Sequence, residues 1–164
     1  IVGIIKKEKS IELFNKEVAD ELTAVHQYMY FHFHADDQGL DLLAGLFKKT
    51  AIDEMIHVET LAERILFLGG DVDMNSTKDI EQIRDISEML AKAKNMEDES
   101  VKEYNEWANI CSKNADSGTK KLFEHLVEDE ENHFDTFDLE LEKLEKYGDN
   151  YLALQSMESS KSEE

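Results

Sequence analysis

The sequence predicts an all-α protein in which four long helices form a bundle and a short fifth helix follows. The 164 residues include no proline and only 7 glycines, and segments rich in Glu, Lys, Leu, Ala and Met favour helix over strand. Glycines and turn residues divide the chain at four places: 36–39, 69–79, 113–118 and 148–149. The result is four helices of about 28 residues, arranged as two hairpins joined by a long crossover between the second and third helices.

Local patterns support each element in turn. Apolar residues recur at steps of three and four along each long helix and predict its buried face; these stripes run over 14–28, 47–68, 86–108 and 123–144. Gly69 is suited to end the second helix, and Asp85 with Glu88 three residues later is a variant capping box that begins the third. The amphipathic segment 151–157 predicts the short fifth helix. Residues 1–157 are therefore expected to form one domain, and the acidic residues 158–164 a disordered tail.

Charge and composition exclude several classes of function. The formal charge is −20, with 38 acidic against 18 basic side chains, which argues against binding to nucleic acid or anionic membranes and permits attraction of cations. No apolar run approaches the roughly 20 residues of a membrane span. Residues 1–7 lack the apolar run of a secretory signal, and the single cysteine, Cys111, cannot form an intramolecular disulfide. A cytoplasmic location is expected.

Acidic residues interrupt every apolar stripe, and two of them belong to Glu-x-x-His pairs, Glu54 with His57 and Glu130 with His133. This spacing places both side chains of a pair on one helix face. A glutamate lies 33 residues before each pair, at 21 and at 97, and the whole pattern repeats with an offset of 76 residues. The midpoints fall in the two short turns, so antiparallel folding brings the six residues to one height: Glu21, Glu54, His57, Glu97, Glu130 and His133.

Four buried carboxylates require compensation by positive charge. A single glutamate in an apolar stripe usually reaches out to water, but four in register are hard to explain in that way. Two divalent cations would balance four carboxylates if both histidines were neutral. Oxygen and imidazole ligands without thiolate suit iron or manganese. Tyr28 and Tyr104, also 76 residues apart, are expected to be core aromatics with a useful hydroxyl group.

The chain resembles the bacterioferritins, a haem-containing family within the ferritin-like superfamily. The resemblance extends from Ser10 to Met157 and is carried by four segments: DELTAVHQY at 20–28, AIDEMIH at 51–57, ERILFLG at 63–69 and DEENH at 129–133. It implies that Glu21, Glu54 and His57 hold one iron ion, that Glu97, Glu130 and His133 hold the other, and that Glu54 and Glu130 bridge the two, with Tyr28 beside them.

The activity implied by this resemblance is that of a ferroxidase. Two Fe(II) ions per subunit would give electrons to dioxygen or hydrogen peroxide, and the Fe(III) would be stored within a hollow shell of 24 identical subunits. The resemblance leaves open whether the pair of iron ions is a stable cofactor or passes through the centre on its way to storage.

Met55 lies about 100° round the helix from Glu54, on a second apolar strip with Ala51, Ile52 and Ala62. Such a strip most often forms a subunit interface. The resemblance instead implies that Met55 from each of two subunits binds one shared haem iron, in a pocket lined by further residues, Leu22, Val25, His26 and Met29. This haem would carry electrons inward from a ferredoxin-type donor to release stored iron.

One departure from the family concerns an extra iron site on the inner wall that some members build from a histidine and an aspartate. Lys49 stands at the histidine position, while Asp53 remains, so this site is expected to be lost.

Three alternatives compete with iron storage. A rubrerythrin-like enzyme of peroxide defence needs four cysteines for its second iron site, and the sequence has one. A Dps-like DNA-protecting shell often carries a basic tail, whereas this sequence ends in two glutamates. A non-catalytic interaction bundle would leave the four acids in register without a purpose.

Overall fold

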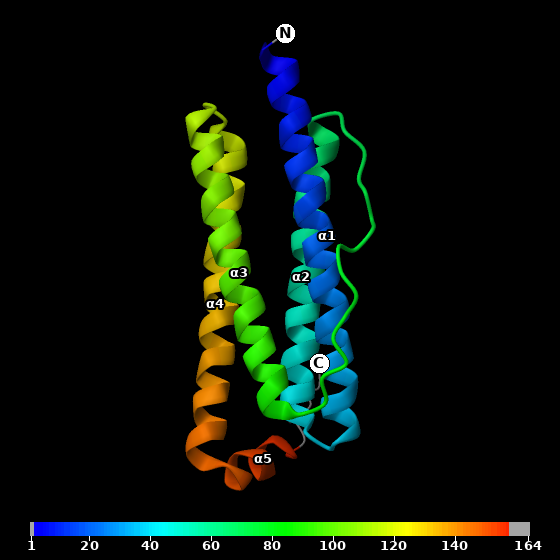
Figure 1. The fold of residues 1–164 in the computed structure, drawn as a ribbon, viewed down its shortest axis with the longest axis vertical. Coiled ribbons are helices and arrows are strands. Elements are labelled where there is room, and N and C mark those ends of the chain that lie inside the picture. The colour runs from blue at the N-terminus through cyan, green and yellow to red at the C-terminus, as the bar shows by residue number, and fades with distance from the viewer. Residues whose placement is uncertain (1, 158–164) are drawn as a thin grey trace, which may run out of the picture.

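The computed structural model describes residues 2–157, which form five helices and no strand (Figure 1). The predicted all-α bundle is therefore confirmed. In chain order the helices are α1 (Val2–Asp37), α2 (Asp41–Phe67), α3 (Ile86–Lys113), α4 (Ser117–Tyr147) and α5 (Asp149–Gln155). At 36 residues α1 is longer than expected, whereas α2, α3 and α4 have 27, 28 and 31 residues.

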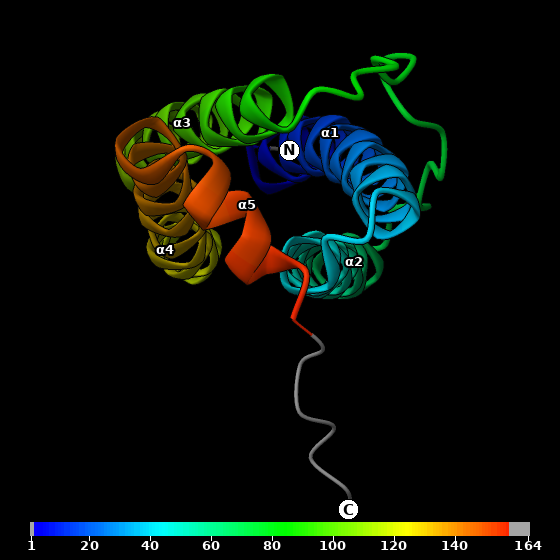
Figure 2. The ribbon, with the colours of Figure 1, turned by 90° about the horizontal axis from the view of Figure 1, so that it is seen from below.

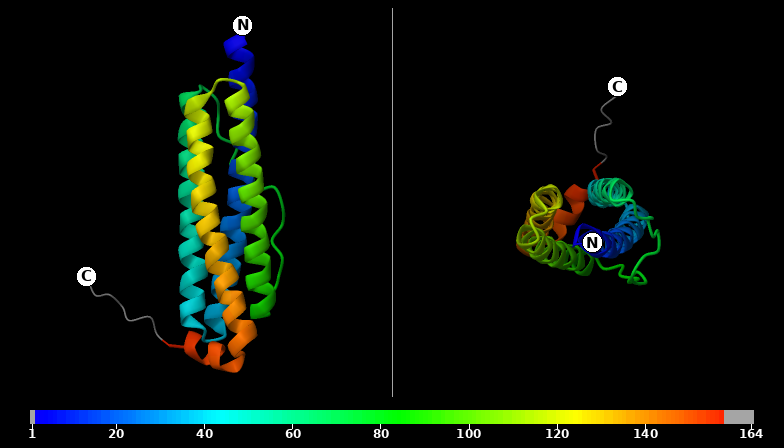
Figure 3. Two further views of the ribbon diagram at one scale, coloured as in Figure 1. Left: turned by 90° about the vertical axis from the view of Figure 1, so that its left-hand side faces the viewer. Right: turned by 90° about the horizontal axis from the view of Figure 1, so that it is seen from above.

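The long helices stand at the corners of an elongated bundle, with α1 beside α2 and α3 beside α4 (Figure 2). Helix α5 crosses the end of the bundle from α4 towards α2. The connection between α2 and α3 passes along the outside of the bundle beside α1 (Figure 3). Side chains of α1 hold it there: Asn15 donates to the backbone oxygen of Asp71 at 2.9 Å, and Gln27 bonds both backbone groups of Glu81.

The helix ends follow the local patterns of the sequence. The side chain of Asp85 accepts a hydrogen bond from the backbone N–H of Glu88 at 3.0 Å, which confirms the predicted cap of α3. Beyond the end of α2, Gly69 adopts a φ of +80°, a conformation that other residues rarely take. The backbone N–H of Gly70 then bonds the oxygen of Ile65 and satisfies one of the last carbonyls of α2.

Two apolar clusters fill the bundle, one towards each end. The first includes Phe31, Phe47 and Phe137, together with residues of α5. The second is built around the stacked rings of Phe14 and Phe123, whose centroids lie 5.3 Å apart. The core is thus interrupted between the clusters, where the polar residues of the predicted centre lie. Among the described residues, no helix combines the length and the apolar character that a membrane span requires.

Candidate metal centre

The structure brings together all six residues that the sequence analysis singled out. Two overlapping groups result, and within each the potential ligand atoms lie within 4.8 Å of one another. One group consists of Glu21, Glu54, His57 and Glu130, and the other of Glu54, Glu97, Glu130 and His133. Since Glu54 and Glu130 belong to both groups, they lie where two adjacent cations could share them.

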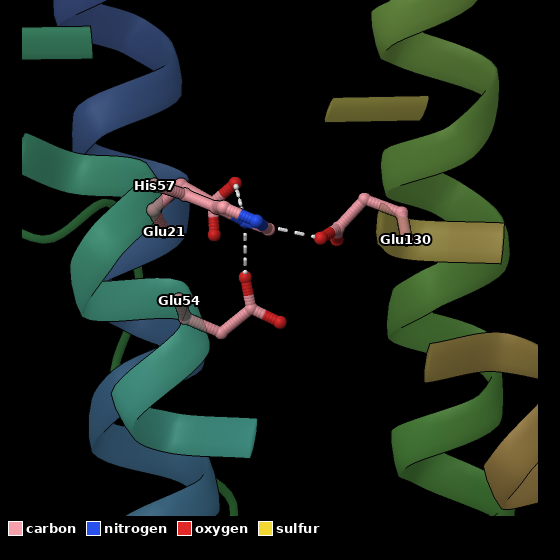
Figure 4. Close-up of side chains that lie close together, drawn as sticks. All are labelled: Glu21, Glu54, His57 and Glu130. Atoms are coloured by element: carbon pink, nitrogen blue, oxygen red, sulfur yellow. Dashed lines mark hydrogen bonds and ion pairs between the residues drawn. The ribbon is translucent and has the colours of Figure 1, made fainter. Parts of the chain in front are cut away.

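Each histidine points one ring nitrogen into this cluster. The Nδ1 atom of His57 lies 2.9 Å from Glu54, 3.1 Å from Glu130 and 3.5 Å from Glu21 (Figure 4). The Nδ1 atom of His133 lies 3.2 Å from Glu54 and 3.5 Å from both Glu97 and Glu130. The two ring centroids are 6.0 Å apart. The helices α2 and α4 thus present equivalent Glu-x-x-His pairs to each other across the bundle.

The outer nitrogens of the two rings face two aspartates that the sequence analysis did not assign to the centre. The Nε2 atom of His57 lies 3.3 Å from Asp129, and that of His133 lies 3.2 Å from Asp53. Such carboxylates fix the orientation of a metal-binding imidazole and increase its basicity. A recognisable pattern was present, because each aspartate directly precedes the glutamate of a Glu-x-x-His pair and the two are 76 residues apart.

Asp53 has a further partner, since Lys49 lies 2.8 Å away. Although burial opposes the change, the hydrogen bonds from Lys49 and His133 lower the pKa of Asp53 below its usual value. Its carboxylate therefore stays charged and has a partner on both sides.

Two tyrosines lie directly against the cluster. The Tyr28 hydroxyl donates a hydrogen bond to Glu97, and the Tyr104 hydroxyl donates one to Glu21. Burial raises the pKa of both hydroxyls well above the usual value, and the charges of the neighbouring glutamates add to this effect. Both tyrosines are therefore neutral donors. The resemblance placed only Tyr28 beside the centre, whereas the structure gives each half its own tyrosine.

Without a cation, the cluster can reduce its charge repulsion only by holding protons. Burial and the charges of the other glutamates raise the pKa of Glu54 well above its usual value and that of Glu97 to about 8. Burial would also raise the pKa of Glu130, but its interactions with His133 and His57 lower it to about 2. Burial alone would lower the pKa of both histidines, yet the surrounding carboxylates raise it well above the usual range.

Four buried atoms of the cluster have no partner in hydrogen-bonding geometry: Glu54 Oε1, Glu97 Oε2, Glu130 Oε1 and His133 Nδ1. Buried polar atoms are almost always satisfied, because leaving one unpaired costs about 1–3 kcal/mol. All four atoms belong to residues of the two groups described above. The donor set therefore fits a pair of divalent cations.

A cavity of about 360 Å³ between α2 and α4 opens beside the cluster. Its lining includes both histidines and the two aspartates that face them. The cavity thus lies against the outer edge of each imidazole.

Met55 is 55% exposed on α2, and Ile52 beside it is also exposed. Of the predicted apolar strip, Met55 and Ile52 are exposed, Ala62 is partly buried and Ala51 is buried. Ala51 is 2% exposed because it packs into the cluster around Phe47. Of the residues expected to line a haem pocket, Leu22, Val25 and Met29 are partly buried, and His26 is exposed.

Comparison with known proteins places this fold in the ferritin-like class: the model of the ferritin-like domain matches residues 11–147. The bacterioferritin of Desulfovibrio desulfuricans is 34% identical over 148 residues, which cover 90% of this chain and 83% of that protein. The bacterioferritin of Brucella melitensis is 32% identical and is covered to 88%, over 86% of this chain.

A crystal structure of the Desulfovibrio desulfuricans bacterioferritin, which concerns that protein's diiron site in different catalytic states, superimposes with a TM-score of 0.94 at 32% identity. The match covers 99% of this chain and 95% of that one. The chain belongs to the bacterioferritin family.

Proposed function

We propose that the protein is an iron-storage ferroxidase that binds two Fe(II) ions per subunit and oxidises them to Fe(III). The observation that carries this proposal is the pair of buried ligand groups that share Glu54 and Glu130. Glu21 and His57 would complete the first iron site, and Glu97 and His133 the second. Two ions bridged in this way would lie about 3.5–4 Å apart, as in other two-metal sites.

The charges of the site support two Fe(II) ions as the substrate. Their combined charge of +4 would balance the four carboxylates once both histidines were neutral. Because the pKa values of Glu54, Glu97 and both histidines are raised without metal, iron has to displace protons as it binds. Binding is therefore expected to weaken as the pH falls.

The oxidation step transfers one electron from each iron. Two Fe(II) ions, together with two protons, reduce dioxygen to hydrogen peroxide or hydrogen peroxide to two waters, and the Fe(III) passes to storage. The carboxylates favour Fe(III) over Fe(II) by their negative charge. The neighbouring hydrogen bonds hold these ligands in place: Tyr104 and Tyr28 bond Glu21 and Glu97, while Asp129 and Asp53 orient the two histidines.

We propose that Met55 would hold the iron of a haem shared by two subunits. Its thioether is exposed on a face of α2 that carries apolar neighbours and no part of the metal centre, so a second copy of the chain could bring its own Met55 to the same iron. A bound haem supplies one-electron transfer. Reduced by a ferredoxin-type donor, it would support release of the stored iron.

Family membership also supports a proposal for the assembly and the location. We expect a closed shell of identical subunits, 24 in number, built from haem-bridged dimers in the cytoplasm. The formal charge of −20 would concentrate cations around such a shell.

Aerobic titration with Fe(II), followed by ultraviolet absorbance, tests the proposed activity. Rapid oxidation that saturates at two irons per chain supports it, and no rapid phase would refute it. Repeating the titration anaerobically with hydrogen peroxide addresses the alternative of a Dps-like or rubrerythrin-like protein. Oxidation by peroxide alone would favour peroxide defence over storage.

A further inference from the structure

The two aspartates that face the histidines of the centre differ in their outer partners. Lys49 lies one helical turn before Asp53 on α2, and its ammonium group donates a hydrogen bond to Asp53 Oδ2 at 2.8 Å. The residue 76 positions later, one turn before Asp129 on α4, is His125. Its Nε2 atom lies 3.9 Å from Asp129 Oδ2, which is too far for a hydrogen bond. A lysine cation is thus bound to one aspartate only.

Lys49 shares its acceptor atom with a histidine of the centre. The Nε2 atom of His133 lies 3.2 Å from the same Oδ2 atom of Asp53 that accepts the hydrogen bond from the lysine. Contacts therefore run without a break from Lys49 through Asp53 to His133. On the other side, His57 lies 3.3 Å from Asp129, and within the described part of the chain no lysine or arginine forms an ion pair with Asp129.

Lys49 also lines the cavity of about 360 Å³ beside the centre, together with both aspartates and both histidines. No other lysine and no arginine belongs to the described lining of this cavity. Since Lys49 is bound to Asp53, its positive charge lies on the His133 side. The lysine side chain is 74% exposed, so water screens its charge and limits the size of its effect.

The lysine affects the two histidines differently. A carboxylate that accepts from the outer nitrogen of an imidazole increases the basicity of the inner nitrogen and strengthens its bond to a metal ion. Asp129 gives this support to His57. On the other side the ammonium group of Lys49 competes for the oxygen of Asp53 and offsets its negative charge, so His133 receives less support. The same ammonium group repels a divalent cation bound beside His133, and both effects weaken cation binding there.

We propose that Lys49 lowers the affinity of the His133 side for cations, so that the first Fe(II) ion binds beside His57 and the second beside His133. This proposal rests on the ferroxidase function proposed above, because it concerns the order in which the two substrate ions enter the centre. Lys49 is a positioning residue in this account: it acts on the cation through its charge and through Asp53, without contact to the ion.

Three variants of the full-length protein test the role of the lysine. Lys49→Met keeps the apolar stem and removes the charge, whereas Lys49→Arg keeps the charge. Lys48→Met is the matched control, because it removes the same charge from an exposed lysine at the neighbouring position of α2. Calorimetric titration with Zn(II), which is not oxidised, measures the two affinities. Anomalous diffraction at the zinc edge, from crystals given one Zn(II) per chain, shows which histidine the first ion occupies.

The wild type and Lys48→Met are expected to bind two Zn(II) ions with unequal affinity, the first beside His57. Lys49→Met should bind the second ion about fivefold more tightly, the size expected for one exposed charge, and the first with unchanged affinity. Lys49→Arg should retain both wild-type affinities, because the charge and a donor to Asp53 remain.

A fourth variant moves the lysine to the other half of the centre. His125→Lys, combined with Lys49→Met, places the ammonium group one turn before Asp129 instead of Asp53. The order of binding should then reverse, with the first Zn(II) beside His133. A residue that mattered only for the folding of α2 would not transfer the order in this way.

A first Zn(II) beside His133 in the wild type, or divided equally between the two sides, would overturn the proposal. Weaker binding of the second ion by Lys49→Met would also overturn it, because the lysine would then support the site by holding Asp53 in place. An unchanged second affinity in Lys49→Met, or an equal change in Lys48→Met, would do the same. A wild type that neither binds Zn(II) at the cluster nor oxidises Fe(II) would instead refute the proposed function, and the role of Lys49 with it.

Discussion

The two halves of the centre have the same ligands but different surroundings. In each half a tyrosine bonds the first glutamate and an aspartate faces the histidine, always 76 residues apart. Beyond this layer the equivalence ends: Glu17 and Trp107 correspond to Ala93 and to Phe31, which is packed in the apolar cluster near α5. The repeat therefore extends to the residues that contact the ligands and not to those behind them.

A bridging ligand belongs to both halves, so we expect its removal to have the largest effect on the rate of Fe(II) oxidation. Glu54→Ala should lower the rate of Fe(II) oxidation by about 100-fold or more, because both sites lose a carboxylate. The rate is measured by stopped-flow absorbance. Glu59→Ala, which alters an exposed glutamate of the same helix, is the control and should retain the wild-type rate. If the Glu54→Ala protein oxidised iron at the wild-type rate, Glu54 would not be a ligand of the centre.

Met55 lies outside both halves of the centre, so its replacement should leave iron oxidation there unchanged. Met55→Leu preserves the apolar surface but removes the sulfur, and we expect haem binding to be lost while two irons per chain are still oxidised. Visible spectra before and after reduction, with the haem content per chain, provide the measurement. Retention of haem with bis-methionine ligation would show that another residue supplies the ligand.

The two aspartates that face the histidines allow metal binding to be weakened in one half of the centre at a time. Asp129→Asn should lower metal affinity at the His57 site, and Asp53→Asn at the His133 site, each by about 10- to 100-fold. Titration with Zn(II) in a calorimeter would then resolve one weak and one strong site. Two sites weakened to the same extent by a single substitution would mean that the halves are not separable in this way.

The smallest expected effect is the change with pH in the stability of the metal-free protein against unfolding. The pKa of Glu17 and that of Glu97 are each raised from 4.5 to about 8 in the folded protein. The folded state therefore binds more protons than the unfolded state between these values, and stability should fall as the pH rises from about 5 to 8. Thermal unfolding at several pH values measures this trend.

Glu17→Gln should reduce the same trend, since Glu17 no longer titrates, and bound Zn(II) should reduce it further by replacing the protons of the centre. A melting temperature of the metal-free protein that rises between pH 5 and pH 8 would contradict the assigned directions of these pKa shifts.

The repeat in the sequence predicted most of the centre. The i, i+3 pairs and the 76-residue offset identified all six residues of the cluster because helix periodicity relates directly to position on a face. Asp53 and Asp129 obey the same offset, but an aspartate next to a ligand in sequence lies about 100° away on the helix, and only the packing of α2 against α4 shows that each faces the opposite histidine.

Other features depended on contacts between distant segments. Glu17 breaks the repeat, and its partner Trp107 is 90 residues away across the interface of α1 and α3. The sequence predicted about 28 residues for the first helix, whereas α1 begins at Val2 and has 36. Ala51 was assigned to the exposed strip of α2, but a small side chain between two faces can be buried by either, and here the core cluster covers it.

The central claim is that two metal ions share Glu54 and Glu130 within each subunit. A crystal structure of the protein loaded with Fe(II) under anaerobic conditions, with anomalous diffraction recorded at the iron edge, tests it most directly. The account predicts two anomalous peaks per subunit about 3.5–4 Å apart, one beside His57 and one beside His133, with both glutamates between them. A single peak, or iron bound only away from these six residues, would contradict it.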